Sequence, residues 1–394
     1  MSRSRVIIFK GAISELDFKT DIFIDYLVER QIDHYVVDVS KPWEQEGEAL
    51  VKFLRQGDCI MFSYNDLGID TKYDGKNLWK TYGIPAYTFL VDHPRNFHDA
   101  LLEPPCDVYC ICCDKDHVSF VKEYYEKVKG AFFVPQGGFE SSSIIPASKR
   151  KIDVIYMGSC KGEVKEFAVT PAISGFADEF YSFCIGRMFD NPSLSTEECI
   201  KSYFKENGLA ITKQQLFELY ITVSVDIEKY VRRRYQLSGI HALDKAGIHV
   251  EIYGNHDRWY DEEEPFSDNI VVHERVPVRE LLKILGDSKI SLCFSPWFKK
   301  GCSEKPLDSL INRALCVSDE SEYVKEKYTD GENIIFFDLN NPAQMAQDVK
   351  WLLEHPTVMD AIADKGYETA LLYDNWDIRY DQICGIMGLS VAAR

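Results

Sequence analysis

The stretch Lys151-Ile-Asp-Val-Ile-Tyr-Met-Gly-Ser159 is typical of a buried β-strand that ends in a glycine–serine turn. A matching start lies near the amino terminus, where Arg5-Val-Ile-Ile-Phe9 predicts a buried strand followed by Gly11. Continuous apolar strands, rather than alternating ones, indicate a parallel sheet that is covered on both faces. The chain therefore begins the same architecture twice.

Short β-branched and aromatic runs alternate with amphipathic stretches between these two starts. Helices are predicted at 19–31 and 44–55. Further strands are predicted at 34–39, 59–64, 86–91, 107–113 and 131–135. Strands separated by helices indicate a doubly wound α/β domain, which we assign to residues 1–136. Residues 137–150 contain Gly-Gly, three consecutive serines and a proline, and they predict a linker.

The second domain, 151–367, resumes the alternation after an interruption. Strands are predicted at 249–253, 269–273, 289–294, 314–318 and 333–337. Residues 160–246 break the rhythm and predict a helical insertion, in which 219–225 fit either a strand or a helix. The tail, 342–388, predicts helices throughout.

The amino-acid composition and the net charge disfavour some classes of protein function. The 394 residues include 63 acidic and 45 basic side chains, for a formal charge of −18. A binder of nucleic acid needs a basic footprint, so this class is disfavoured. No stretch approaches the ~18 apolar residues of a membrane span. In the opening MSRSRVIIFKGA, the apolar run before Lys10 is too short for the core of a signal peptide. The twelve cysteines are most simply reduced thiols, so we expect a cytoplasmic protein.

Glycine, serine and basic residues follow the strands of the second domain. Gly158-Ser159 and Gly254-Asn255 each follow a strand. A loop with Lys299, Lys300, Gly301, Cys302 and Ser303 leads into a helix that opens with Glu304-Lys305. Such a loop at a helix N-terminus presents amides and a positive dipole that suit a diphosphate. Asp308, one turn inside, could reach ribose hydroxyls; the alternative is that the lysines are solvated and Asp308 lies on an exposed face.

The first domain offers weaker candidates. Gly11 suits either a tight turn near a ligand or a turn alone, and no GxGxxG fingerprint accompanies it. Asp92-His93-Pro94 follows a buried strand, where a histidine and a carboxylate could supply a general base. The alternative is that Asp92 caps the next turn and His93 is a packing residue.

Two further clusters have ordinary explanations. Asp114 and Asp116 could hold a divalent cation, but we favour a helix cap because a helical pattern follows at once. Arg232-Arg233-Arg234 could bind phosphate, but consecutive helical residues point ~100° apart, which favours a solvated face.

Several motifs occur in a recognisable order. They are Tyr253-Gly254, Val276-Pro277-Val-Arg-Glu280-Leu281, the loop 301–305, Asp308-Ser-Leu-Ile-Asn-Arg313-Ala-Leu, Asp330-Gly331-Glu-Asn333 and Trp376-Asp-Ile-Arg379. This part of the chain, 249–380, resembles the GT-B glycosyltransferases, and most closely the CgeB-like branch of the family-one and family-four type enzymes. Asp92-His93-Pro94 and Pro135-Gln-Gly137-Gly138 resemble the family more weakly. Two positions depart from it, since Asp308 replaces a glutamate and Arg313 replaces a glycine.

The resemblance implies two Rossmann-like domains that face a cleft, with an acceptor on the first, a donor on the second and a final helix, 368–394, that returns to the first. Ser303, Glu304 and Lys305 would then hold the sugar and diphosphate. Gly158, Ser159, Gly254 and Asn255 would admit the donor closely, and Val276 and Glu280 would flank its base. His93 or Asp92 would act as base in an inverting reaction, and Gly11 and Gly137 would line the acceptor side.

We therefore predict a glycosyltransferase that moves a sugar from a nucleoside diphosphate sugar, such as a UDP-sugar, to a hydroxyl acceptor. The acceptor would be a surface polysaccharide, a glycolipid or a protein such as flagellin, with peripheral membrane contact allowed. No metal or separate cofactor is expected, since a helix dipole and basic groups can stabilise the leaving diphosphate. Two other functions stay open: a metal-dependent nucleotidyl or GT-A-type transferase that uses Asp114 and Asp116, and a non-enzymatic two-lobed ligand-binding protein.

Overall fold

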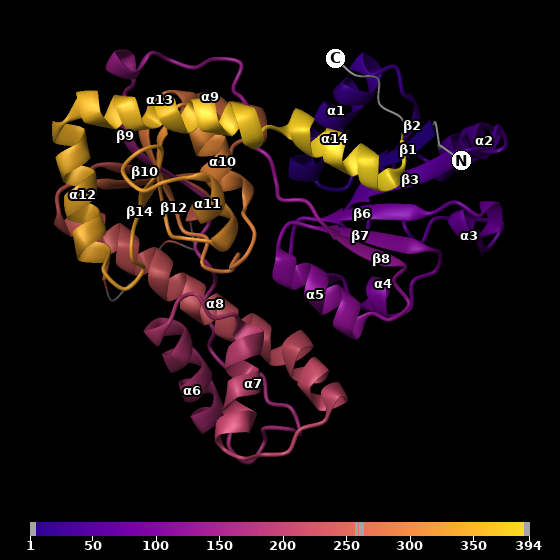
Figure 1. Ribbon diagram of the computed structural model, residues 1–394, viewed down its shortest axis with the longest axis horizontal. Coiled ribbons are helices and arrows are strands. Elements are labelled where there is room, and N and C mark those ends of the chain that lie inside the picture. Colours follow the sequence, from indigo (N-terminus) through magenta and orange to yellow (C-terminus); the bar gives the residue numbers. More distant parts are fainter. Residues whose placement is uncertain (1–4, 257–258, 260–263, 390–394) are drawn as a thin grey trace. The chain divides into compact units, whose positions relative to one another are not determined.

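The computed structural model describes residues 5–256, 259 and 264–389. The chain divides into two compact units (Figure 1). The N-terminal unit contains residues 1–137 and 376–394, and the C-terminal unit contains residues 138–375. Each unit holds a six-stranded sheet.

The sheet of the N-terminal unit is parallel and has the order β2-β1-β3-β6-β7-β8. Its strands are β1 (Arg5–Lys10), β2 (Asp33–Asp38), β3 (Cys59–Tyr64), β6 (Ala86–Leu90), β7 (Val108–Cys112) and β8 (Gly130–Phe133). The apolar runs form these strands because both faces are covered, and β3 is buried along its whole length. The direction of winding reverses between β1 and β3, which is where such sheets bind ligands.

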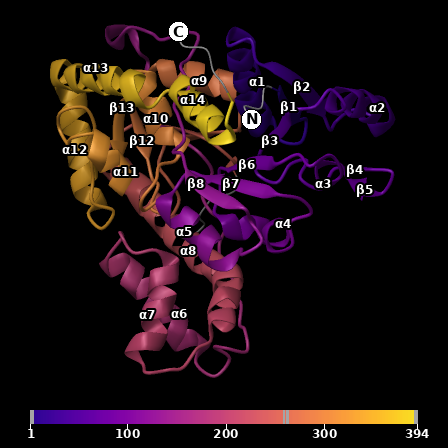
Figure 2. The same cartoon turned by 45° about the vertical axis from the view of Figure 1, so that its right-hand side comes forward.

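Helices cover this sheet on both faces (Figure 2). They are α1 (Ser14–Glu29), α2 (Trp43–Leu54), α3 (Leu78–Tyr82), α4 (His98–Leu102), α5 (Lys115–Tyr124) and, from the chain's end, α14 (Trp376–Met387), with a 3₁₀ turn η1 (Pro94–Phe97). A small antiparallel ribbon, β4 (Lys72–Tyr73) and β5 (Lys76–Asn77), was not predicted. The returning helix α14 packs on α1, where the rings of Phe23 and Tyr380 lie 4.7 Å apart.

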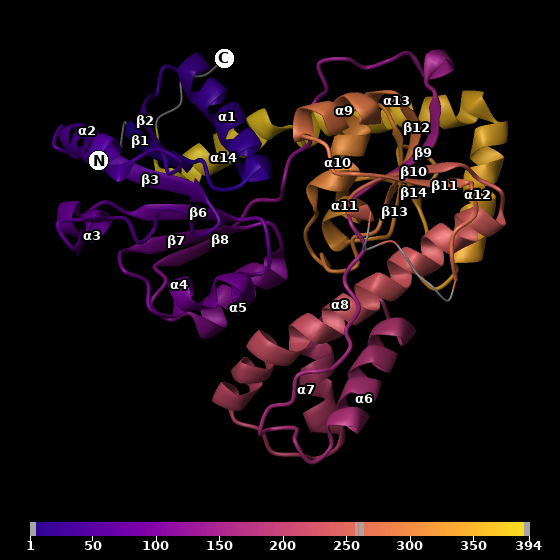
Figure 3. The ribbon, with the colours of Figure 1, turned by 180° about the vertical axis from the view of Figure 1, so that it is seen from behind.

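The C-terminal unit repeats the architecture with the strand order β11-β10-β9-β12-β13-β14 (Figure 3). Its strands, all parallel, are β9 (Ile152–Met157), β10 (Val250–Tyr253), β11 (Ile270–His273), β12 (Ser288–Cys293), β13 (Leu315–Ser318) and β14 (Ile335–Phe336). The direction of winding reverses between β9 and β12. Two doubly wound α/β domains are the fold class that the sequence predicts, and this prediction is confirmed.

The predicted helical insertion contains three helices between β9 and β10. They are α6 (Ala177–Asp190), α7 (Thr196–Glu206) and α8 (Lys213–Lys245). The ambiguous residues 219–225 are helical because they lie inside α8, whose 33 residues span about 50 Å. One end of α8 packs with α6 and α7, and the other end reaches the sheet (Figure 3).

The other helices of the C-terminal unit are a 3₁₀ turn before β9 and the helices that follow β11, β12, β13 and β14. They are η2 (Ala147–Lys149), α9 (Val278–Gly286), α10 (Glu304–Ile311), α11 (Glu322–Lys327), α12 (Pro342–Glu354) and α13 (Pro356–Tyr373). The most important of them for the site is α10, because it starts directly beyond the carboxyl end of β12.

The late Trp376-x-x-Arg379 motif stabilises the N-terminal unit. The Trp376 ring lies 5.2 Å from the Tyr380 ring and 5.9 Å from the Phe89 ring. Arg379 is 2% exposed, and its Nε donates to the carbonyl oxygen of Gln136 at 3.0 Å. The motif thus holds α14 in the N-terminal unit and fixes Gln136, which follows β8.

All twelve cysteines lie in the described part of the chain. Each one is a buried free thiol. Buried thiols are inert packing residues, and burial raises the pKa of most of them; examples are Cys106 and Cys110, whose pKa values rise to about 12.

Candidate functional site

Gly158 and Lys305 meet at the reversal point between β9 and β12. Gly158 ends β9 with φ +141°, and a Cβ at this position would lie 2.5 Å from Lys305 Nζ. The glycine therefore allows the ammonium group to lie against the backbone. Burial lowers the pKa of Lys305, and the neighbouring Arg232 adds to this effect. A partly desolvated cation beside a glycine turn at a strand end is suited to hold an anion.

The turn after β10 touches the turn after β9. A Cβ on Gly254 would lie 2.3 Å from the carbonyl oxygen of Gly158. The Asn255 amide donates to Ser159 Oγ at 2.8 Å. The four residues predicted from these two turns are therefore brought together, and glycine is required where the two backbones meet.

Serine side chains from the loop and from the start of α11 hold the loop before α10. Ser303 is the N-cap residue, but its side chain makes no capping hydrogen bond to the helix, and its Oγ lies 2.9 Å from Ser295 Oγ. Ser321 Oγ donates to the carbonyl oxygen of Gly301 at 2.7 Å. The adjacent Cys302 is buried, so this thiol is a packing residue. Lys305 and Glu304 lie in the first turn of α10, beside these groups.

A buried carboxyl group supports the same loop. Asp319, after β13, is 5% exposed, and its Oδ1 accepts from the amide of Ser295 at 2.5 Å. Burial raises the pKa of Asp319 to about 7. This carboxyl group therefore titrates in the neutral range.

The raised pKa of Asp319 predicts a dependence of stability on pH. The folded protein retains a proton that the unfolded chain loses above pH ~4, so the free energy of unfolding should fall between about pH 4 and 7, by at most about 4 kcal/mol. Asp319→Asn keeps an oxygen for the Ser295 amide and should remove this fall. Urea unfolding of both proteins at pH 5 and 8 measures the difference. The exposed Asp268→Asn is the control, and equal pH profiles for Asp319→Asn and wild type would contradict the assignment.

Asp308 is oriented toward the start of the C-terminal unit. It is 8% exposed, and its Oδ1 accepts from the Phe139 amide at 2.7 Å. Asn312, one turn later, accepts from the Ser141 amide at 2.7 Å and donates to the Phe139 carbonyl oxygen at 2.8 Å. One carboxylate oxygen of Asp308 thus binds α10 to residues 139–141. The predicted alternative, in which Asp308 lies on an exposed face, is therefore wrong for this residue. A contact between Asp308 and a ribose stays a prediction.

Asp308→Ala should lower the free energy of unfolding by about 1–3 kcal/mol, because it leaves the buried Phe139 amide without this acceptor. Asp308→Asn should recover most of that loss. Denaturant unfolding measures the stability, and calorimetry with nucleotide measures the ribose contact separately. A stability of Asp308→Ala equal to wild type would contradict the bond to Phe139. Unchanged nucleotide affinity would remove Asp308 from the ligand site.

The insertion contributes residues that the sequence did not place at the site. The Arg232 guanidinium on α8 lies 3.4 Å from the centre of the Trp297 ring, and its side chain is 16% exposed. Arg234 is exposed, as a solvated face would be. The run of three arginines indicates a basic segment in the sequence. Helical geometry alone does not reveal which of the three contacts Trp297.

Val276 and Glu280 lie further along the same edge of the sheet. The rings of Tyr253 and His273 are stacked with centres 4.5 Å apart, at the ends of β10 and β11. Burial raises the pKa of Tyr253, and Glu280 contributes to this shift. Val276 is half-buried and Glu280 is exposed. Their predicted role, to flank a nucleoside base, stays a prediction.

His93 has a local structural role in the N-terminal unit. Its Nδ1 accepts from the Arg95 amide at 3.1 Å and so caps η1. Its ring packs 4.5 Å from His117 and 4.7 Å from Phe120. Burial holds the pKa of His93 well below its usual value. Asp92 is exposed beside it, and the catalytic role of this pair stays a prediction.

Other predicted residues of the N-terminal unit have turn and cap geometry. Gly11 has φ +98°, and its amide donates to Asp17 Oδ1 at 2.7 Å. Asp114 is 1% exposed and caps α5, because its side chain accepts from the Asp116 amide at 2.7 Å. Gly137 is buried at the end of the first segment of this unit. Acceptor roles for Gly11 and Gly137 stay predictions.

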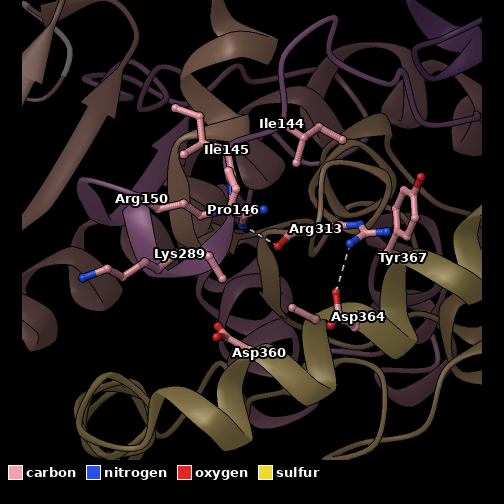
Figure 4. Close-up of a pocket in the computed structure, with 11 residues that line it drawn as sticks. Ile144, Ile145, Pro146, Arg150, Lys289, Arg313, Asp360, Asp364 and Tyr367 are labelled. Carbon is pink, nitrogen blue, oxygen red and sulfur yellow. Dashed lines mark hydrogen bonds and ion pairs between the residues drawn. The ribbon is translucent and has the colours of Figure 1, made fainter.

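A separate pocket of about 490 Å³ lies at the opposite, amino-terminal edge of the second sheet (Figure 4). None of the predicted site residues lines it. Arg313 lies beside Tyr367, 4.1 Å from the ring centre, and 3.5 Å from Asp364. Arg150 donates to main-chain carbonyl oxygens, including that of Ser288 at 2.9 Å. The pocket's guanidinium groups therefore already have protein partners.

Arg313 also explains one departure from the family pattern. It follows α10 with φ +56°, the left-handed conformation for which glycine is the usual residue. Arg313 therefore has a conformation that a glycine would adopt without strain, at a cost of about 1 kcal/mol.

Neither a metal-binding cluster nor a membrane-spanning helix occurs in residues 5–256, 259 and 264–389. Within them, no three His, Cys, Asp or Glu side chains converge in a way that could hold a metal ion. No helix in this part of the chain is long and apolar enough to cross a membrane.

Comparison with known proteins places this geometry in context. A family model described as glycosyl transferase-like matches residues 233–385. This range includes 249–380, where the sequence resemblance was found. No curated protein matches the chain in sequence.

Solved structures of similar fold cover nearly the whole chain. T4 phage BGT in complex with UDP and Mn²⁺ is 11% identical, has a TM-score of 0.57, and matches over 98% of this chain and 99% of that one. An alpha-glucosyltransferase in complex with UDP-glucose and DNA is 14% identical, with a TM-score of 0.56 over 97% and 99% of the chains. Sucrose-phosphate synthase from Thermosynechococcus elongatus is 8% identical, with a TM-score of 0.51 over 98% of each chain. Residues 233–385 thus match a glycosyl transferase-like family model, and the chain has the two-domain GT-B fold of these solved structures.

Proposed function

We propose that this protein transfers a sugar from a nucleoside diphosphate sugar to a hydroxyl group of an acceptor. The observation that supports this most directly is the Lys305 ammonium against Gly158, in the first turn of α10. A partly positive helix N-terminus and a half-buried cation together suit the charge that a departing diphosphate develops. UDP and UDP-glucose are bound by proteins of similar fold.

The donor would bind the C-terminal unit along the carboxyl edge of β10, β9 and β12. Lys305 would contact the diphosphate, with Arg232 as a second nearby cation, since it contributes to the lowered pKa of Lys305. The apposed Gly158 and Gly254 would let the donor approach the main chain. Ser303 and Glu304 would hold the sugar.

The acceptor would bind the N-terminal unit at the carboxyl ends of its strands. We assign the base of an inverting reaction to Asp92 in preference to His93. Because Nδ1 of His93 accepts the Arg95 amide, the neutral ring carries its proton on Nε2 and has no second lone pair for a substrate. Asp92 is exposed, and a carboxylate can accept a proton without a change of tautomer. Surface polysaccharide, glycolipid and protein acceptors all carry the required hydroxyl group.

Thermal stabilisation by ligands tests the function. The full chain should be stabilised by one or more nucleoside diphosphate sugars from a panel of uracil, guanine, adenine and thymine donors, by ~2.7 kcal/mol at a hundred times Kd. Release of the nucleoside diphosphate then measures turnover. Binding without turnover across acceptor mixtures would support the two-lobed binding protein instead, and no stabilisation by any donor would contradict the proposal.

Activity should survive chelation, because Lys305, Arg232 and the N-terminus of α10 can stabilise the leaving group without a metal. Turnover in EDTA should stay within about twofold of the untreated rate. Loss of activity in EDTA that Mn²⁺ or Mg²⁺ restores would contradict this expectation. It would then favour a metal-dependent transferase, with Asp114 and Asp116 as the first residues to test.

A further inference from the structure

The inserted helix α8 contacts both turns that border the candidate donor site. Arg232 lies on Trp297, in the loop between β12 and α10. Arg233 NH1 donates to the carbonyl oxygen of Lys161 at 3.0 Å, in the loop after β9. A Cβ on Gly239 would lie 2.1 Å from the Phe294 ring, so the helix backbone packs directly at the end of β12. One helix therefore contacts the loops that follow β9 and β12, the two strands at the reversal point.

Gln236 makes the most specific of these contacts. Its side chain is buried, with 2% exposure. Nε2 donates to the Tyr156 hydroxyl at 2.7 Å and lies 3.4 Å from the Ser159 carbonyl oxygen. Oε1 accepts from the Lys161 amide at 3.1 Å. A single amide group thus connects Tyr156, near the end of β9, to Ser159 and Lys161 in the loop that follows.

We propose that Gln236 and Arg233 are positioning residues that hold the loop 158–161 in the conformation that binds the donor diphosphate. This proposal rests on the proposed function and gives the insertion a role in it. The Lys305 ammonium can lie against the backbone only while Gly158 keeps its positive φ and stays next to it. The loop begins with Gly158, a residue that permits many backbone conformations, so contacts from α8 favour the one that the structure has.

The outer part of the insertion stabilises α8 at a distance from the site. Tyr220 OH donates to the carbonyl oxygen of Glu197 on α7 at 3.3 Å, and Val223 and Ile227 are fully buried. Thr212 and Gln215 form a capping box at the start of α8. These contacts hold the outer end of α8 against α7 and stabilise the helix that carries Arg233 and Gln236.

Binding of inorganic pyrophosphate to the full chain tests the proposal without knowledge of the nucleoside base. Gln236→Leu, which keeps the volume but removes the amide, should weaken pyrophosphate binding at least tenfold in calorimetry. Arg233→Met should have a similar effect, because it loosens the same loop. The double variant should lose less than the product of the two single effects. Gln214→Leu, exposed on the same helix, is the matched control.

The outcomes separate the positioning role from a merely structural one. Wild-type pyrophosphate affinity in a folded Gln236→Leu or Arg233→Met variant overturns the proposal, even if the melting temperature falls. Partial recovery in Gln236→Glu, which keeps the acceptor for the Lys161 amide, supports it. If wild type itself binds neither pyrophosphate nor any nucleoside diphosphate, the proposed function fails first. If Gln236→Leu does not fold, Arg233→Met decides the question alone.

Discussion

Lys305→Met should reduce kcat about 10²–10³-fold, the range found when one group that stabilises developing charge is removed. The side chain has the required position, since its ammonium lies next to Gly158 in the first turn of α10. Methionine retains the hydrocarbon stem and removes only the charge. Because burial already disfavours the charged lysine, the folded variant should be at least as stable as wild type. Steady-state kinetics and thermal unfolding measure the two effects.

Lys289→Met is the control for Lys305→Met. Lys289 lies at the opposite edge of the same sheet, paired with Asp153 at 2.6 Å. Its removal should leave kcat unchanged. An Lys305→Met variant that retains wild-type kcat and KM would show that no leaving group develops charge beside this residue, and the donor site would then have to lie elsewhere.

Asp92→Asn should lower kcat about 10²–10⁴-fold, the usual effect of the loss of one general base, with little change in donor affinity. His93→Asn should leave kcat within a few-fold of wild type, because asparagine can still cap η1 by accepting the Arg95 amide. His93→Ala should instead lose about 1 kcal/mol of stability. Turnover and melting temperature are measured together for all three variants.

Asp99→Asn, another exposed carboxylate of the same region, is the control for Asp92→Asn. If His93→Asn loses 10²-fold or more in kcat while Asp92→Asn does not, the base is His93, and the ring must then leave the Arg95 amide during the reaction. If neither variant changes kcat, the reaction has no base in this turn, as expected for a retaining mechanism.

The doubly wound fold could be predicted because parallel strands require continuous apolar runs. Cys59–Tyr64 is buried along its length, and its predicted and observed bounds agree. The ribbon of Lys72–Tyr73 and Lys76–Asn77 could not be predicted, since two-residue polar strands have no hydrophobic pattern. Residues 219–225 also illustrate a limit. Their β-branched composition is ambiguous locally, and the capping box at Thr212 and the packing of α8 make them helical.

Site residues that come after a predicted strand could be predicted from the sequence. Residues whose place depends on how another helix packs could be predicted less well. Gly158, Gly254 and Lys305 each follow a predicted strand, and parallel topology necessarily brings strand ends together. Gln236 and Arg232 lie in the insertion, and nothing in their local sequence indicates which loop α8 will touch. The direction of Asp308 was equally hidden, because a carboxylate one turn into a helix can reach forward to a ligand or sideways to Phe139.

Burial of every thiol makes the cysteines a natural reporter of local opening. The N-terminal unit contains Cys59, Cys106, Cys110, Cys112, Cys113 and Cys384. The C-terminal unit contains Cys160, Cys184, Cys199, Cys293, Cys302 and Cys316. A thiol reagent can reach these sulfur atoms only when the surrounding structure opens, so the labelling rate follows the free energy of that opening. Peptide masses after pulsed alkylation would therefore reveal whether the two halves of the chain unfold together or one after the other.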